Sequence, residues 1–91
     1  MESRVYKIPE RIDRNSSTKV QESLDALLDS GVTDLVIDMS DTQYISSAGL
    51  RVLVATQKRL IDGGKFALTN VPPIVKETLD LTGLAAFMPI I

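Results

Sequence analysis

Two adjacent hydroxyl groups are the residues of this sequence best placed to do chemistry. Ser46 and Ser47 stand directly before Ala48-Gly49-Leu50, where a helical pattern of apolar residues begins. The start of a helix presents unpaired backbone N–H groups and the positive end of the helix dipole, so a phosphate group is stabilised there. Capping the helix is the commoner use of such a serine. The two uses are compatible, because Ser46 could cap the helix while Ser47 is modified.

The same hydroxyls are poor candidates for nucleophilic catalysis. The sequence has no histidine and no cysteine, which excludes a Ser-His-Asp triad, a thiolate nucleophile, a disulfide and a Cys-based zinc site within this chain. No Ser-x-x-Lys motif surrounds Ser47, since Leu50 stands three residues after it. A lysine or a carboxylate would be the remaining way to activate Ser47. The sequence therefore predicts a protein that is not an enzyme.

The composition limits the partners and the location of the protein. The chain has 91 residues and a net charge of −2, with basic and acidic residues mixed along its length, which is enough for one small domain over residues 1–91. It has no basic block, no long apolar run and no apolar N-terminal segment. Gly63-Gly64-Lys65 lacks the pattern of a phosphate-binding loop and is predicted to be a turn. We expect a cytoplasmic protein with no cofactor of its own and no nucleic-acid or membrane partner.

The elements that must position the two serines follow from the alternation of apolar runs with helical periodicity. This alternation predicts an α/β fold with a small, mainly parallel β-sheet and helices packed on it. The expected strands are Arg4–Ile8, Asp34–Met39, Lys65–Thr69 and an edge strand Phe87–Ile91. Three helices alternate with them. The first is capped within Asn15-Ser16-Ser17 and ends at Gly31, the second opens at Ser46-Ser47 and ends at Asp62-Gly63-Gly64, and the third opens at Pro72-Pro73 and ends at Gly83. Right-handed crossovers place the loops Pro9–Asn15, Ser40–Ile45 and Asn70–Pro73 at one end of the sheet, where sites are usually found.

The helix that opens at Ser47 is predicted to have two distinct faces, because successive residues turn by about 100°. The core face is expected to carry Leu50, Leu53, Val54, Leu60 and Ile61. The outward face is expected to carry Ala48, Val52, Ala55 and Arg59, and to form a partner interface. Small residues there would let another helix approach closely. The alternative is that single exposed apolar residues are common and carry no function.

The stretch VIDMSDTQYISSAGLRVLV, residues 36–54, resembles the signature of STAS domains, specifically the anti-sigma factor antagonist group. RIDRNSS and LTNVPPIVKETLDLTGL extend this resemblance over roughly residues 4–90. The resemblance implies a STAS-like fold. Most members begin with a hairpin of two strands and end with a further helix. The fold expected here lacks the first strand of that hairpin and the last helix, which leaves the sheet edge at Arg4–Ile8 uncovered.

The resemblance also implies roles for individual residues. In the family the phosphorylated serine lies two residues before the glycine of the Gly-Leu pair, which corresponds to Ser47. Ser46, Gly49, Asp13 and Asp38 are then expected to support the switch loop. Asp13 matches an acidic residue of the neighbouring loop, and Asp38 matches the one that ends the second strand; ordinary loop or cap roles are the alternative for both. Gly49 is expected to let another backbone or a phosphate come close.

The function that the resemblance implies is a partner switch in sigma-factor-dependent transcription. The unphosphorylated protein binds an anti-sigma factor that is also a serine kinase, and a sigma factor is released. The kinase uses its own ATP and magnesium to phosphorylate Ser47, the complex dissociates, and a metal-dependent serine phosphatase resets the switch. The alternative is a STAS subunit of a larger assembly, in lipid transport or a stress complex, that needs no phosphorylation. A weak homodimer through the uncovered sheet edge is a further expectation.

Overall fold

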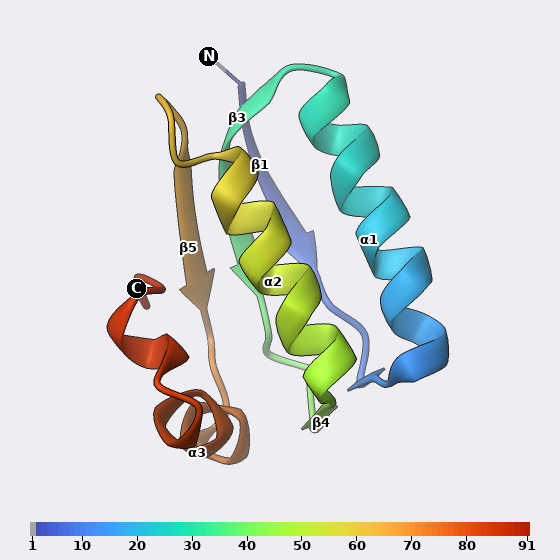
Figure 1. Ribbon diagram of the computed structural model, residues 1–91, viewed down its shortest axis with the longest axis vertical. Coiled ribbons are helices and arrows are strands. Elements are labelled where there is room, and N and C mark those ends of the chain that lie inside the picture. Colours follow the sequence, from blue (N-terminus) through green and yellow to red (C-terminus); the bar gives the residue numbers. More distant parts are fainter. Residues whose placement is uncertain (1) are drawn as a thin grey trace.

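Strands and helices alternate along residues 2–91, the part of the chain that the computed structural model describes (Figure 1). The elements are β1 (Glu2–Lys7), β2 (Arg11–Ile12), α1 (Arg14–Asp29), β3 (Val32–Asp38), β4 (Tyr44–Ile45), α2 (Ser47–Arg59), β5 (Lys65–Thr69), α3 (Pro73–Leu81) and a 3-10 turn η1 (Leu84–Ala86). The predicted α/β fold with a parallel sheet is confirmed. Within residues 2–91, none of the helices has the length and apolar character needed to cross a membrane.

The main sheet has three parallel strands in the order β1-β3-β5, and helices cover one of its faces. Each pair of neighbouring strands is joined by a helical crossover, and α1 and α2 lie on the same side of the sheet (Figure 1). Leu35 and Ile37 of β3 and Phe66 and Leu68 of β5 are buried on that side with residues of both helices. This alternation of buried and less buried positions is the period of two expected for a strand with one covered face.

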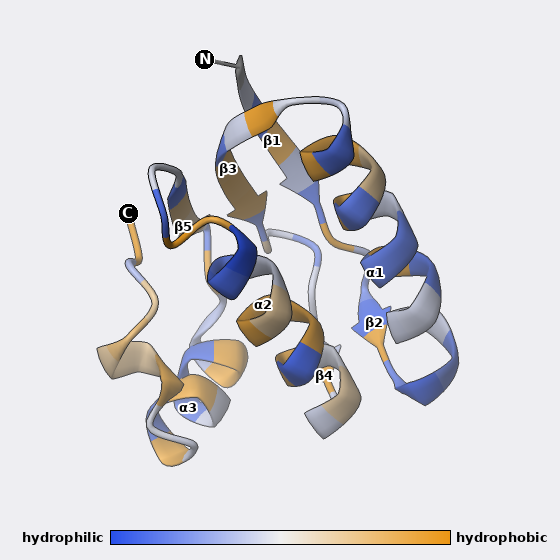
Figure 2. Cartoon of the chain, turned by 45° about the horizontal axis from the view of Figure 1, so that its top comes forward, coloured by the Kyte–Doolittle hydropathy of each residue, from blue (hydrophilic) through white to orange (hydrophobic). Residues whose placement is uncertain are grey.

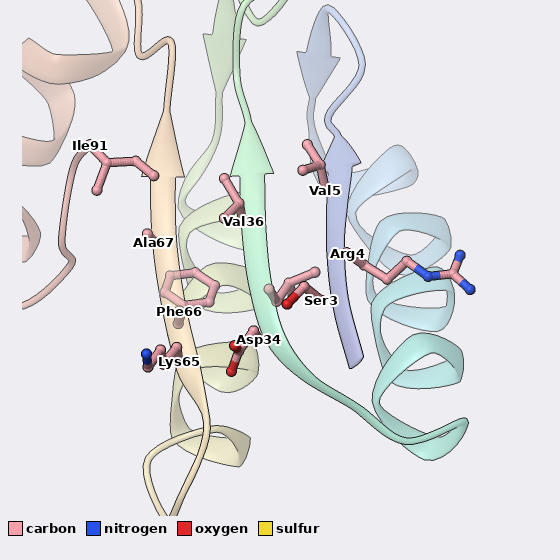
Figure 3. Close-up of a pocket in the computed structure, with 10 residues that line it drawn as sticks. Ser3, Arg4, Val5, Asp34, Val36, Lys65, Phe66, Ala67 and Ile91 are labelled. Carbon is pink, nitrogen blue, oxygen red and sulfur yellow. The ribbon is translucent and has the colours of Figure 1, made fainter. Parts of the chain in front are cut away.

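Within residues 2–91, α1 and α2 lie on one face of the main sheet (Figure 1), and the opposite face carries side chains that line a hollow (Figure 3). Val5, Val36 and Ala67 stand side by side across the three strands and, together with Ile91, line a hollow of about 370 Å³. Val5 is 67 % exposed. Parallel sheets usually have both faces covered. The described part of this chain therefore departs from that rule, with its apolar core on one side of the sheet only.

A second, two-stranded sheet joins the loops that follow β1 and β3. β2 pairs with β4 in parallel, and Arg11 faces Tyr44 while Ile12 faces Ile45. The backbone N–H groups of Gln43 and Tyr44 both donate to the Glu10 carbonyl. The sequence pattern predicts only loops here. The small sheet matters for function because β2 runs directly into α1 and β4 directly into α2.

The C-terminal segment and the end of α2 differ from the prediction. The predicted strand Phe87–Ile91 is reduced to a single parallel bridge between Leu68 and Ile90, and a 3-10 turn precedes it. Ile61, predicted in the core, is 75 % exposed. The reason is that α2 ends at Arg59 with Leu60 as its C-cap, so Ile61 lies outside the helix and its periodicity.

Candidate functional site at the start of helix α2

The two serines have different structural roles. Ser46 is the N-cap of α2, with extended backbone, and its Oγ accepts a hydrogen bond from the Gly49 N–H at 3.2 Å. Ser47 is the first helical residue, and its side chain is exposed. The prediction that these serines open a helix is confirmed. Because Ser46 provides the cap, the hydroxyl of Ser47 is not needed to complete the helix.

The small β2–β4 sheet holds the start of α2 in place. The Ser46 N–H donates to the Ile12 carbonyl at 2.8 Å, which continues the pairing of the two strands. Gly49 lies against this sheet, since a Cβ at that position would come within 2.7 Å of Ile12 Cγ2 and 2.8 Å of Ile45 Cγ1. The groups that come close to Gly49 are therefore the side chains of Ile12 and Ile45, and the approach of a phosphate stays a prediction. The glycine is required by the side chains of Ile12 and Ile45.

Asp13 is the N-cap of α1 and directly follows β2. Its Oδ1 accepts hydrogen bonds from the N–H groups of Asn15 and Ser16, both at 2.9 Å, and the Asp13 N–H donates to Ser16 Oγ at 2.9 Å. The cap is thus Asp13 and not a residue of Asn15-Ser16-Ser17 as predicted, because the carboxylate reaches two N–H groups. These bonds, that from the Ser16 backbone first, lower the pKa of the Asp13 carboxyl, and the charge of Arg11 adds to the effect.

The two cap residues are neighbours in the fold. Asp13 directly follows Ile12, Ser46 directly follows Ile45, and Ile12 and Ile45 stand opposite each other in the parallel β2–β4 pair. Since parallel strands end at the same edge of their sheet, both helices start there. The structure therefore brings Asp13 and the two serines together.

Asp38, in contrast to Asp13, forms its hydrogen bonds with the loops that follow β3 and β5. Its Oδ1 accepts from the Ser40 N–H at 2.9 Å and from Asn70 Nδ2 at 3.3 Å. The hydrogen bonds from Ser40 chiefly, with those from Asn70 and the charge of Lys7, lower the pKa of the Asp38 carboxyl. No hydrogen bond in residues 2–91 links Asp38 to Ser46 or Ser47. From the sequence, Asn70 is predicted only as the start of a loop, with no contact to Asp38. Its backbone is left-handed, with φ of 53°, a conformation that asparagine tolerates.

The predicted outward face of α2 faces α1 instead. Val52 is 5 % exposed and belongs to the core. Arg59 forms ion pairs with Asp25 at 3.1 Å and Asp29 at 2.7 Å, both on α1. Ala48 and Val52 border α1 residues. The predicted outward orientation of Ala48, Val52 and Arg59 is therefore wrong, because α1 covers a second side of α2. Ala55, in contrast, lines a groove on the other side of the helix.

The accessible face of α2 is a groove on its other side, toward η1. In Figures 1 and 2, α2 lies between α1 and the C-terminal segment that contains α3. The groove has a volume of about 450 Å³ and is lined by Ser47, Leu50, Arg51, Val54, Ala55, Lys58 and Leu84. Leu50, Val54 and Leu84 give it an apolar floor, while the exposed Arg51 and Lys58 border it. The helical spacing of Ser47, Arg51, Val54 and Lys58 in the sequence is the signal that could have found this face.

The site has no constellation typical of a metal centre. Among residues 2–91, no group of three or more His, Cys, Asp or Glu side chains is placed to hold a metal ion. What the arrangement offers is an exposed hydroxyl at a helix start, an adjacent fixed carboxylate at Asp13 and an apolar groove with basic borders.

Comparisons with known proteins place this arrangement in a family. The chain is 33 % identical over 81 residues to a putative anti-sigma factor antagonist, BtrV, of Bordetella bronchiseptica, covering 87 % of this chain and 69 % of that protein. It is 28 % identical to the anti-sigma-F factor antagonist RsfB of Mycobacterium tuberculosis, covering 88 % and 66 %. The crystal structure of an anti-sigma factor antagonist from Mycobacterium paratuberculosis matches with a TM-score of 0.89 at 26 % identity, covering 97 % of this chain and 75 % of the other. The family model described as STAS domain matches residues 2–91. The chain therefore belongs to the STAS domain family.

Proposed function

We propose that this protein is an anti-sigma factor antagonist that is switched by phosphorylation of Ser47. The observation that carries the proposal is the division of roles at the start of α2, where Ser46 caps the helix and leaves the Ser47 hydroxyl exposed beside a groove. Relatives named as anti-sigma factor antagonists support the same class of function. The protein acts as a binding module, and the chemistry of the switch belongs to its partners.

In the proposed cycle, the unphosphorylated protein binds an anti-sigma factor that is also a serine kinase. The Ser47 oxygen attacks the γ-phosphorus of the kinase's ATP, held with magnesium. A new O–P bond forms, the bond to ADP breaks, and the serine proton passes to a base of the kinase. A serine phosphatase later removes the phosphate with water and restores the hydroxyl.

The proposed partner surface is the groove lined by Ser47, Leu50, Arg51, Val54, Ala55, Lys58 and Leu84, which keeps Ala55 of the face predicted from the sequence. Phosphate adds about −1.5 to −2 charges. At Ser47 this charge stands at the border of the groove, where it meets a partner surface that accommodated a neutral hydroxyl. A local change of charge is enough to favour dissociation without a change of fold.

Asp13 and Gly49 support this switch in different ways. Asp13 fixes a negative charge next to Ser46, so that phosphorylation of Ser47 adds a second negative charge beside the first. Gly49 lets the first turn of α2 pack directly on Ile12 and Ile45, which fixes where Ser47 emerges. Asp38 acts indirectly, by tying together the loops after β3 and β5.

The edge of the main sheet supports a second, weaker association. Within residues 2–91, β1 pairs with β3 and with no other strand, so it is an edge strand. An exposed strand edge can pair with another chain, so we propose a weak homodimer through Arg4–Ile8. Sedimentation velocity over a concentration series, combined with amide exchange along this strand, tests it. Monomer at all concentrations with slow exchange at Val5 would contradict the dimer.

The switch itself is tested with the cognate kinase. The purified protein is incubated with the kinase, ATP and magnesium, and the phosphate is located by mass spectrometry. We expect modification of Ser47, loss of modification in Ser47→Ala, and retained modification in Ser46→Asp, which keeps a capping acceptor. Phosphate on Ser46, with Ser47→Ala still modified, would contradict the assignment. A protein that takes no phosphate from any such kinase would favour a structural STAS subunit.

A further inference from the structure

Arg51 is a cation one helical turn after Ser47. The two residues are spaced i, i+4 on α2, which places their Cβ atoms about 5–6 Å apart on one face of a helix. Both side chains are exposed, and both line the same groove. The pair thus joins the proposed phosphorylation site to a positive side chain on the same rigid element.

The basic residues of α2 differ in their existing partners. Arg59 is held by Asp25 and Asp29 of α1. The guanidinium of Arg51, in contrast, makes no ion pair and no side-chain hydrogen bond among residues 2–91. Lys58 also lines the groove but lies seven residues further along the helix, which is about 10 Å along its axis. Arg51 is therefore the cation of this groove that is both near Ser47 and uncommitted.

We propose that Arg51 holds the phosphoryl group once Ser47 is phosphorylated; this inference rests on the proposed function of Ser47. A guanidinium binds phosphate through two parallel charge-assisted hydrogen bonds. An acidic group four residues before a basic one is the favourable order on a helix, because it also agrees with the helix dipole. The phosphate on Ser47 is thus stabilised by Arg51 on one side and by the start of α2 on the other.

Pairing of Arg51 with the phosphate means that phosphorylation changes the charge of the groove in two ways. Before phosphorylation, Arg51 and Lys58 present positive charge beside the apolar floor of Leu50, Val54 and Leu84. Such a surface fits an apolar segment of a partner that carries an acidic side chain near Arg51. Phosphorylation adds a negative charge and also withdraws Arg51 into a pair with the phosphate. The acidic group of the partner then loses its cation and faces an anion.

A phosphate titration tests this inference without the kinase. The full chain is made with phosphoserine incorporated at position 47 during translation, and the second pKa of its phosphate, ordinarily about 6, is followed by phosphorus NMR. A nearby cation favours the doubly charged form and lowers this pKa. We expect Arg51→Gln to raise it by about 0.15 to 0.4 of a unit at low salt, which corresponds to the free energy of a helical i, i+4 charge pair. Arg51→Lys should retain part of the lowering.

Two matched variants identify the cation. Lys58→Gln removes a positive charge from the same groove, and Arg14→Gln removes one at the neighbouring start of α1. Both should leave the phosphate pKa unchanged, and the effect of Arg51→Gln should shrink in about 1 M salt. An unchanged pKa in Arg51→Gln, or an equal shift in Arg14→Gln, would overturn the role of Arg51. Because the phosphoserine is introduced directly, this outcome is independent of whether a kinase modifies Ser47.

Discussion

The starts of α1 and α2 lie side by side but are completed differently. α1 begins after Asp13, a charged cap that accepts from two N–H groups and is reciprocated by Ser16. α2 begins after Ser46, a neutral cap with a hydrogen bond from Gly49 at 3.2 Å. The position that Ser16 holds in α1 is occupied in α2 by Gly49, which has no side chain to reciprocate. The cap of α1 is charged and reciprocated, whereas the cap of α2 is neutral and is not reciprocated.

The reason for this difference is steric. Any side chain at position 49 would collide with Ile12 or Ile45, so a reciprocal capping box cannot form at the start of α2. The N–H groups of Ser47 and Ala48, which have no hydrogen-bond partner among residues 2–91, remain available for an anion. The fold therefore provides one permanent negative charge at Asp13 and, next to it, a serine hydroxyl at which a second negative charge can be added and removed.

The largest expected effect comes from charging the face of α2 that packs against α1. Val52→Asp places a carboxylate at a position that is 5 % exposed, among core residues. We expect a loss of at least ~3 kcal/mol in the free energy of unfolding, since a buried unpaired charge is among the most destabilising changes. Urea denaturation measures it.

Val5→Asp is the matched control for that substitution. The same chemical change at a side chain that is 67 % exposed should alter stability by only about 0.5 kcal/mol. Equal stability of the two variants would mean that Val52 is not in the core, and that α2 and α1 are not packed as neighbours.

A second, smaller effect tests the steric reason directly. Gly49→Ala adds a Cβ within 3 Å of Ile12 and Ile45, so the first turn of α2 must move or the isoleucines must shift. Overpacking of this kind costs about 1–3 kcal/mol. Ser47→Ala, two residues earlier and exposed, should change stability by about 0.5 kcal/mol or less. If Gly49→Ala is as stable as the unaltered protein, the start of α2 does not depend on contact with the small sheet.

The strands β3 and β5 and the helix start at the two serines could be predicted from the sequence. The apolar runs of β3 and β5 and the helical pattern after Ser47 are local patterns, and they placed both serines at a helix start. The range of β5 agrees with the prediction at both ends. The family signature pointed to Ser47 and Asp13, and the structure brings both to the same edge of the β2–β4 pair.

Features that depend on distant segments could not be predicted in the same way. β2 and β4 are two residues long and exist through pairing between loops far apart in the sequence. Periodicity gives the angles between residues of α2 but not which sides of the helix have neighbours. For this reason Val52 was expected outside, although α1 covers it, and the role of Leu84 in the groove was not anticipated.

The charge of Asp13 predicts a pH dependence. The pKa of Asp13 in the folded protein is lowered, so the carboxylate stabilises the fold above the unfolded pKa of about 3.9, and this contribution is lost as the pH falls through the folded value. Asp13→Asn keeps a good cap without the charge. The variant should be less stable at neutral pH, and its difference from the unaltered protein should shrink as the pH falls through the folded pKa of Asp13. Urea denaturation at several pH values gives the difference curve, and a difference that persists in acid would exclude the charge as its source.

The smallest effect is expected from a substitution that makes the start of α2 resemble that of α1. Ser46→Asp keeps the capping oxygen and adds a fixed negative charge at the positive end of the helix dipole, which is typically worth about 0.3–1 kcal/mol. Ser46→Asn is the matched control, because it caps equally well without charge. Thermal unfolding at neutral pH should therefore rank Ser46→Asp above Ser46→Asn, and the difference should vanish in acid as the new carboxyl is protonated. The opposite ranking at neutral pH would mean that repulsion from Asp13 exceeds the attraction of the helix start. A phosphate on Ser47 would then depend on a cation such as Arg51 rather than on the helix alone.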